Sequence, residues 1–142
     1  MDARIYNMVH VKCGGTAYDM TMQLADPIDS LYDQGVEHWI ALIEKVHSMP
    51  GQGVASTFKF GMNYGQWIGI LTALQIPYST ITPKKWMAHY GAMPKDKKDR
   101  KNYIKAMAQG LYPNAERITL ATSDAVLIAH CAMEKHLSQA KG

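Results

Sequence analysis

Two carboxylates stand beside apolar segments, where they could hold a divalent metal ion. Glu44 follows the apolar run at residues 39–43, which has the composition of a buried strand, and Pro50 and Gly51 end this segment. Asp124 stands just before the apolar string AVLIA, where the first turn of a C-terminal helix is expected. Two acids that converge at the carboxyl edge of an α/β sheet favour a cation bound by oxygen ligands. The alternative for Asp124 is a helix cap, because helix N-termini favour negative charge.

The positive charge of the chain is concentrated in one segment. Residues 83–117 contain nine basic and three acidic residues, a net charge of +6, whereas the whole chain carries +3. Such a segment indicates a polyanionic partner, and together with metal-bound carboxylates it favours phosphodiester cleavage. The alternative is a solvated lysine-rich helix that binds nothing. The expected contacts to DNA phosphates are Lys84, Lys85, Lys97, Lys98, Arg100 and Lys101, with His47 in the loop after Glu44 as a further candidate.

Other residues that could bind DNA or a metal ion are less strongly indicated by the sequence. Trp86 lies beside Lys85 in the basic segment and is the aromatic side chain that we expect nearest to DNA. His130, Cys131 and His136 share one expected helix, but their spacing does not form a four-ligand zinc set.

The elements that must position these residues alternate between strands and helices, which predicts one α/β domain over residues 1–142. Two runs that flank a Cys-Gly-Gly turn predict a β-hairpin over residues 5–21. A buried strand is expected at residues 38–46, and a further strand at 77–82. Helices are expected at residues 26–35, 54–74, 82–91 and 97–113, and from residue 122 to near the C-terminus.

Composition indicates in which cellular environment the protein is expected. No apolar run approaches the roughly 18 residues of a membrane span, and no apolar region follows the first charges as in a signal peptide. Cys13 and Cys131 do not make a disulfide framework, so a reducing compartment is expected.

The long helix expected at residues 54–74 carries a ridge of glycines at four-residue spacing, Gly61, Gly65 and Gly69. Each glycine costs a helix about 1 kcal/mol relative to alanine, so a close contact should offset the cost. That contact could lie within one subunit, or it could be a dimer interface.

The strings IEKVHSMPGQGVASTFKFGMNYG and IPYSTITPKKW, followed by LYP and SDAVLIA, resemble the RuvC-like Holliday junction resolvases, in particular their bacteriophage branch. The resemblance covers the chain from about residue 18 onward. It implies an RNase H-like fold, a mixed sheet with flanking helices. It also implies a homodimeric, Mg²⁺- or Mn²⁺-dependent endonuclease that nicks four-way DNA junctions, without a membrane, in the cytoplasm of a bacterium or a phage-infected cell.

The resemblance assigns roles to individual carboxylates. Glu44 matches the strand-end ligand of the metal site, and Asp124 matches the aspartate that opens the last helix of the family. Asp2 matches the central ligand by its offset of five residues from Asn7, although the first strand that should carry it is truncated. Asp19 is an alternative only if the sheet is rearranged.

One departure from the family pattern bears on activity. Leu120 and Ala121 stand where the family has an acid or a histidine, and neither side chain can bind a metal ion. The hydroxyl groups of Thr122 and Ser123 are weak substitutes for a carboxylate. Two functions are therefore expected from the sequence: a junction-cutting nuclease, or a catalytically impaired protein that binds DNA junctions on the same fold.

Overall fold

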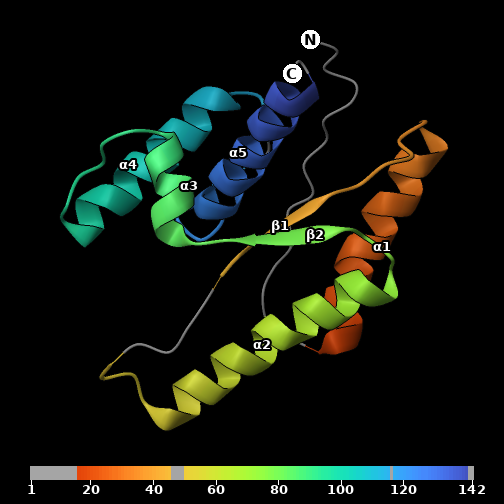
Figure 1. Cartoon of the computed structure of the whole chain (residues 1–142), viewed down its shortest axis with the longest axis horizontal. Coiled ribbons are helices and arrows are strands. Elements are labelled where there is room, and N and C mark those ends of the chain that lie inside the picture. The colour runs from red at the N-terminus through yellow and green to blue at the C-terminus, as the bar shows by residue number, and fades with distance from the viewer. Residues whose placement is uncertain (1–15, 46–49, 116, 141–142) are drawn as a thin grey trace. The chain divides into compact units, whose positions relative to one another are not determined.

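The computed structural model describes residues 16–45, 50–115 and 117–140, with the backbone alone for residues 136–140. Within these residues the chain forms five helices and a small parallel sheet of two strands, so the predicted α/β class is confirmed (Figure 1). The chain divides into two compact units, with the boundary between Thr80 and Ile81. In the described part, no helix is long and apolar enough to cross a membrane.

The first unit combines two helices with the sheet. Its elements are α1 (Ala17–Asp33), β1 (Ala41–Glu44), α2 (Val54–Ala73) and β2 (Tyr78–Ile81), whose last residue already belongs to the second unit. The strands lie side by side, and the Ala41 backbone N–H donates a hydrogen bond to the Pro77 carbonyl at 2.9 Å, just before β2. α1 packs against α2, and the fully buried Met20 is the centre of its inward face.

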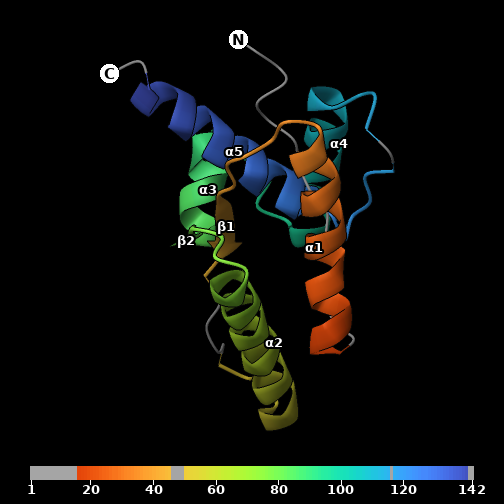
Figure 2. The ribbon, with the colours of Figure 1, turned by 90° about the vertical axis from the view of Figure 1, so that its right-hand side faces the viewer.

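The second unit is a group of three helices. α3 (Pro83–His89) and α4 (Lys97–Leu111) both pack against α5 (Ser123–Ala140), as Figure 2 shows. Thr82 caps α3, with Pro83 at the first helical position, and the side chain of Asp96 caps α4. The buried core of this unit consists of Trp86, Ile104, Ala108, Ile118, Val126, Leu127, Ile128 and Cys131.

The predicted hairpin over residues 5–21 is wrong in its second strand. Residues 17–21 are the start of α1, because Thr16 and Asp19 form a capping box in which each side chain accepts a hydrogen bond from the other residue's backbone N–H. The predicted helix start near residue 26 is also wrong, and Pro27 lies inside α1. The first strand of the hairpin lies outside the described residues.

The buried strand predicted at residues 38–46 is shorter and more exposed than expected. β1 has four residues, none of them fully buried, and the Ile40 side chain is 59% exposed. A sheet of two described strands has few neighbours that could cover β1. The helices predicted at 54–74, 82–91, 97–113 and at the C-terminus are confirmed, as is the strand at 77–82. The RNase H-like arrangement of the sheet and the single domain stay predictions.

The capping box gives a direct test of helix against strand at residue 16. Thr16→Val keeps the shape of the side chain but removes its oxygen, so α1 should lose about 1 kcal/mol of stability. Urea unfolding of the full chain measures this loss. A strand would instead tolerate the substitution, because valine favours strands. Thr80→Val on the exposed side of β2 is the matched control and should change stability by less than about 0.5 kcal/mol.

Candidate functional site

Asp124 lies in the first turn of α5, at a half-buried position of the second unit. The turn before it is ordered by hydrogen bonds from the Ser123 backbone N–H to the Thr119 carbonyl at 3.0 Å and from the Thr119 N–H to Thr122 Oγ1 at 3.0 Å. Burial raises the pKa of Asp124, while the positive charges of Lys101 and Arg100 on α4 act in the opposite direction. The carboxylate therefore lies within the electrostatic reach of the basic helix.

The neighbouring hydroxyl groups already have partners in the turn. Thr122 Oγ1 accepts from the Thr119 N–H, and the buried Ser123 hydroxyl donates to the Leu120 carbonyl at 3.5 Å. Both side chains thus stabilise the start of α5 rather than project toward a ligand. Leu120 and Ala121 are exposed and provide no side-chain oxygen.

None of the other predicted metal ligands lies in the turn that contains Asp124. Glu44 ends β1 in the first unit and is partly buried, whereas Asp124 belongs to the second unit, so their convergence stays a prediction. Asp2 lies outside the described residues. Asp19, the alternative ligand, is used in the capping box of α1. Among the residues that the structure describes, no three His, Cys, Asp or Glu side chains are grouped so that they could hold a metal ion.

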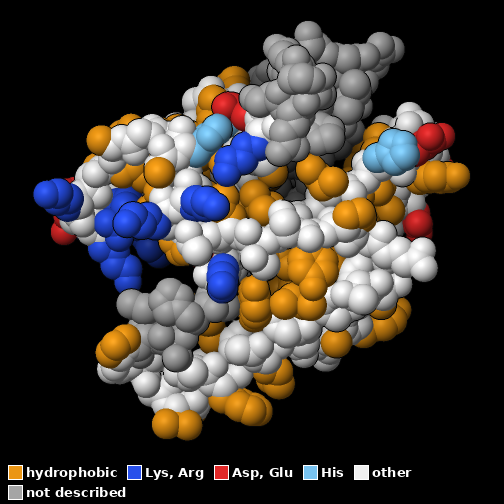
Figure 3. Space-filling view, in the orientation of Figure 1, with side chains coloured by type: hydrophobic (Ala, Val, Ile, Leu, Met, Phe, Trp, Pro, Cys, Tyr) orange, Lys and Arg blue, Asp and Glu red, His pale blue; other side chains and the backbone are white. Residues whose placement is uncertain are grey.

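The predicted DNA contacts lie on the surface of the second unit. We call them the basic surface, which comprises Lys84 and Lys85 in the first turn of α3 and Lys97, Lys98, Arg100 and Lys101 in the first two turns of α4. All are exposed except Arg100, which is partly covered and donates a hydrogen bond to the Lys95 carbonyl at 3.0 Å. Figure 3 shows Lys and Arg side chains gathered over α4. His47 lies outside the described residues.

The basic surface joins the segment that leads to Asp124. An open hollow on the second unit is lined by Lys97, Lys98, Lys101 and Asn102 of α4, by Asp96 and by Leu120. Cations at a helix N-terminus oppose the helix dipole, which costs up to about 1 kcal/mol each. Asp96 at the cap and Asp99 in the first turn offset part of this cost. The placement of these lysines is thus unfavourable for the helix itself, which favours a role in binding.

Trp86 does not take the position predicted for it. Its side chain is fully buried in the second unit, and its ring meets the edge of the Tyr90 ring at a centroid distance of 6.4 Å. The prediction that Trp86 lies beside DNA is therefore wrong, because the apolar bulk of the indole decides its place in the core of a small helical unit.

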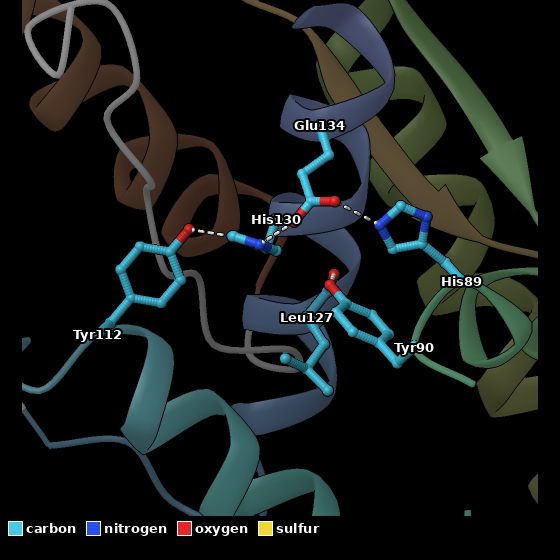
Figure 4. Close-up of polar contacts among 6 residues, drawn as sticks. All are labelled: His89, Tyr90, Tyr112, Leu127, His130 and Glu134. Carbon is cyan, nitrogen blue, oxygen red and sulfur yellow. Dashed lines mark hydrogen bonds and ion pairs between the residues drawn. The ribbon is translucent and has the colours of Figure 1, made fainter. Parts of the chain in front are cut away.

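A polar cluster that sequence reasoning missed connects the three helices of the second unit (Figure 4). Glu134 on α5 accepts a hydrogen bond from His89 Nε2 of α3 at 2.9 Å and pairs with His130 Nε2 on its own helix. The other ring nitrogen of His130, Nδ1, lies 2.7 Å from the hydroxyl of Tyr112, at the end of α4. We call Glu134, His89, His130 and Tyr112 the Glu134 cluster. The i,i+4 spacing of His130 and Glu134 is visible in the sequence, but the contact with His89 is not.

The protonation of the Glu134 cluster follows from its geometry. Partial burial raises the pKa of Glu134. The hydrogen bonds and charges of His89 and His130 lower it by more, so the pKa of Glu134 lies below its usual range. Burial and the charge of Glu134 raise the pKa of Tyr112, so this phenol is neutral. The contacts fit an arrangement in which both Nε2–H groups donate to Glu134 and the Tyr112 hydroxyl donates to Nδ1 of His130.

Tyr90, which follows α3, makes further contacts with α5. Its hydroxyl donates to the Leu127 carbonyl of α5, and its ring stacks on His130 at a centroid distance of 6.3 Å. Burial is the main cause that raises the pKa of Tyr90, with smaller electrostatic contributions from Cys131 and Glu134.

Glu134→Gln should destabilise the protein in a pH-dependent way. A carboxylate whose pKa is lowered on folding contributes stability above its unfolded pKa of about 4.3, and this contribution is lost as the pH falls through the lowered folded value. Because the side chain is 47% exposed, the loss at neutral pH should be about 1 kcal/mol or less. Urea unfolding of both proteins across the acid range measures the difference, which should vanish below the usual range of glutamate.

Tyr112→Phe is the matched control for this titration. It removes one hydrogen bond of the Glu134 cluster but no carboxylate, so its cost, at most about 1 kcal/mol, should not change as the pH falls through the range in which Glu134 titrates. A difference between wild type and Glu134→Gln that persists unchanged at low pH would contradict the assignment of the charge to Glu134.

No protein-family model matches the chain, and no curated protein matches its sequence.

Proposed function

We propose that this chain is a divalent-metal-dependent endonuclease that cuts branched DNA, in particular four-way junctions, as the resemblance to the RuvC-like resolvases implies. The observation that carries the proposal is the close association of a basic surface with a half-buried carboxylate inside one compact unit. Lys101 and Arg100 act electrostatically on Asp124, and the hollow beside them reaches the turn that leads into α5. A phosphate that binds on this surface would come near a potential metal ligand.

The basic surface supplies the binding part of the proposed function. Its lysines lie in the first turn of α3 and in the first two turns of α4, are exposed, and form no ion pair with an acidic side chain among the described residues. Lysine and arginine bind the phosphate backbone without regard to base sequence, and this suits a protein that recognises the shape of a junction. In this proposal a homodimer presents two such surfaces, one to each side of a junction.

Glu44, Asp124 and Asp2 are the residues proposed to hold Mg²⁺ or Mn²⁺. The donor set of carboxylate oxygens suits these cations, which would supply an activated water and stabilise the leaving oxygen. The protein contributes the ionised carboxylates and orients the phosphate through the basic surface. Because burial raises the pKa of Asp124, the charges of Lys101 and Arg100 help to keep this carboxyl group ionised and ready to bind a cation.

A second function is favoured by one observation at the start of α5. The hydroxyl groups of Thr122 and Ser123 are engaged within the turn, and Leu120 and Ala121 carry no ligand atoms. Asp124 therefore lacks a nearby second oxygen ligand from its own turn. This favours a protein that binds DNA junctions and cuts them slowly or not at all. The cytoplasm of a bacterium or phage-infected cell is the proposed location in both cases.

Binding to DNA should depend steeply on salt. If about four phosphates are neutralised by the basic surface, log K should fall with log salt at a slope of about −4. Lys98→Ala should weaken binding and reduce the slope by about 1, whereas Lys59→Ala, on α2 outside the basic surface, should change neither. Fluorescence anisotropy with a four-way junction and a linear duplex measures both quantities. Equal affinity for junction and duplex would remove the structural selectivity from the proposal.

Cleavage should require the carboxylates and respond to pH in a defined direction. Glu44→Gln and Asp124→Asn should each abolish nicking of a labelled junction, and Mn²⁺ should support it better than Mg²⁺, which gives up its water reluctantly. Because the pKa of Asp124 is raised, nicking should increase as the pH rises through that value. Asp2→Asn should abolish nicking if Asp2 is a ligand. Brisk nicking that survives Glu44→Gln would contradict the metal site, and junction binding without nicking would select the second function.

A further inference from the structure

The open hollow at the start of α4 has a polar side and an apolar side. Residues four positions apart lie one above another on a helix. The polar side therefore consists of two adjacent rows on α4, Lys97 with Lys101 and Lys98 with Asn102. The apolar side is Leu120, in the turn before α5, whose side chain is 46% exposed. A bare phosphate would use the lysines and leave this leucine in water, so the lining suits a ligand that carries both an anion and an apolar surface.

The charges around the hollow favour an anionic ligand. Three lysines against one aspartate leave a net charge of +2 in its lining. The aspartate, Asp96, is used by the helix, because its carboxylate accepts a hydrogen bond from the Asp99 backbone N–H at 3.0 Å. Among the described residues, none of the three lysines forms an ion pair with an acidic side chain. Their ammonium groups are thus left to a ligand.

We propose that this hollow binds one unpaired nucleotide of branched DNA, with the neighbouring phosphates on the lysines, the base against Leu120 and the edge of the base on Asn102. The inference rests on the proposed function, because branched DNA is the partner, and it adds which feature of that DNA is recognised. Bases inside a duplex are stacked and paired, so their faces cannot reach Leu120. An unpaired base can turn out of the stack and enter a protein site.

The size and the hydrogen-bonding groups of the hollow agree with a single nucleotide. Its volume is about 480 Å³, and sites for small ligands typically measure about 300–1,000 Å³. Asn102 is exposed, and its side-chain amide makes no hydrogen bond to another residue in the described part of the chain. An asparagine amide offers one donor and one acceptor to the edge of an adenine, so an unpaired adenosine is the probe of choice.

An acidic peptide is the other ligand that lysines and a leucine could accommodate. DNA is favoured because three of the six residues of the basic surface line the hollow. The phosphate backbone carries a charge at every nucleotide, so it can continue from the hollow toward the other cations of that surface. A short acidic side chain that enters the hollow would also leave the Asn102 amide without a base edge to pair with.

Three duplexes of equal length separate the base from the phosphates. One is fully paired, one contains a single unpaired adenosine, and one contains an abasic nucleotide in its place. Fluorescence anisotropy in EDTA, which prevents cleavage, measures the affinities. The wild-type chain should bind the unpaired adenosine about tenfold more tightly than either other duplex, a loss typical of one apolar contact. Leu120→Ala should reduce this preference to about twofold, with unchanged affinity for the paired duplex.

Two control variants locate the effect. Leu111→Ala is the matched control, because Leu111 is 41% exposed at the other end of α4 and does not line the hollow. This variant should keep the full preference for the unpaired adenosine. Lys98→Ala should weaken binding of all three duplexes by the same factor, because a phosphate contact does not distinguish them. Circular dichroism checks the helix content of each variant.

Several results would overturn the inference. They are equal affinity of the wild-type chain for all three duplexes, an equal loss of preference in Leu120→Ala and Leu111→Ala, and binding of a polyglutamate peptide as tight as that of the unpaired adenosine. A four-way junction without unpaired nucleotides, measured in parallel, reports on the proposed function. Selective junction binding without preference for the unpaired adenosine overturns this inference alone. A preference for the unpaired adenosine without junction selectivity supports it and removes the junction from the proposed function.

Discussion

The burial of one face of α5 is the constraint on which the second unit depends. Val126, Leu127 and Cys131 on this helix are almost completely buried against α3 and α4. Burying a valine or leucine side chain contributes about 1.5–3 kcal/mol, whereas the partly exposed ion pairs of the Glu134 cluster contribute less. The apolar face therefore holds the helices together, and the polar cluster adds hydrogen bonds between them. Because Asp124 starts the same helix, this packing also brings its carboxylate within the influence of Lys101 and Arg100.

The basic surface and the exposed face of α2 depart from local stability rules in two different ways. Lysines at the start of α4 oppose the helix dipole, and apolar side chains on α2 remain in water. In a protein whose parts are otherwise consistent, such departures are expected at functional or strained sites. The first unit thus carries an exposed apolar face on α2, and the second unit carries the basic surface.

Long periodic segments were predictable because local signals agree with one another. Thr82 and Pro83 begin α3, Asp96 begins α4, and the 20 residues of α2 have helical spacing throughout. The segment at residues 16–22 was not predictable in this way, because its short alternation suits a strand as well as a helix. The capping box stabilises the helix at this position. The contact between α1 and α2 goes together with the burial of Met20. Similarly, the apolar run before Glu44 predicted a strand correctly but overestimated how much of it is covered.

The sequence by itself determined the α/β class, the helices of the second unit and the concentration of charge on α3 and α4, since these follow from composition, capping and periodicity within short segments. Tertiary structure alone decided that Trp86 is in the core, that Asp124 is half buried beside Lys101, and that His89 meets Glu134 across 45 positions of the chain. The physical reason is that side-chain burial and pairing between helices depend on which faces meet. Residue order along one helix sets its faces, but the packing of several helices chooses among them.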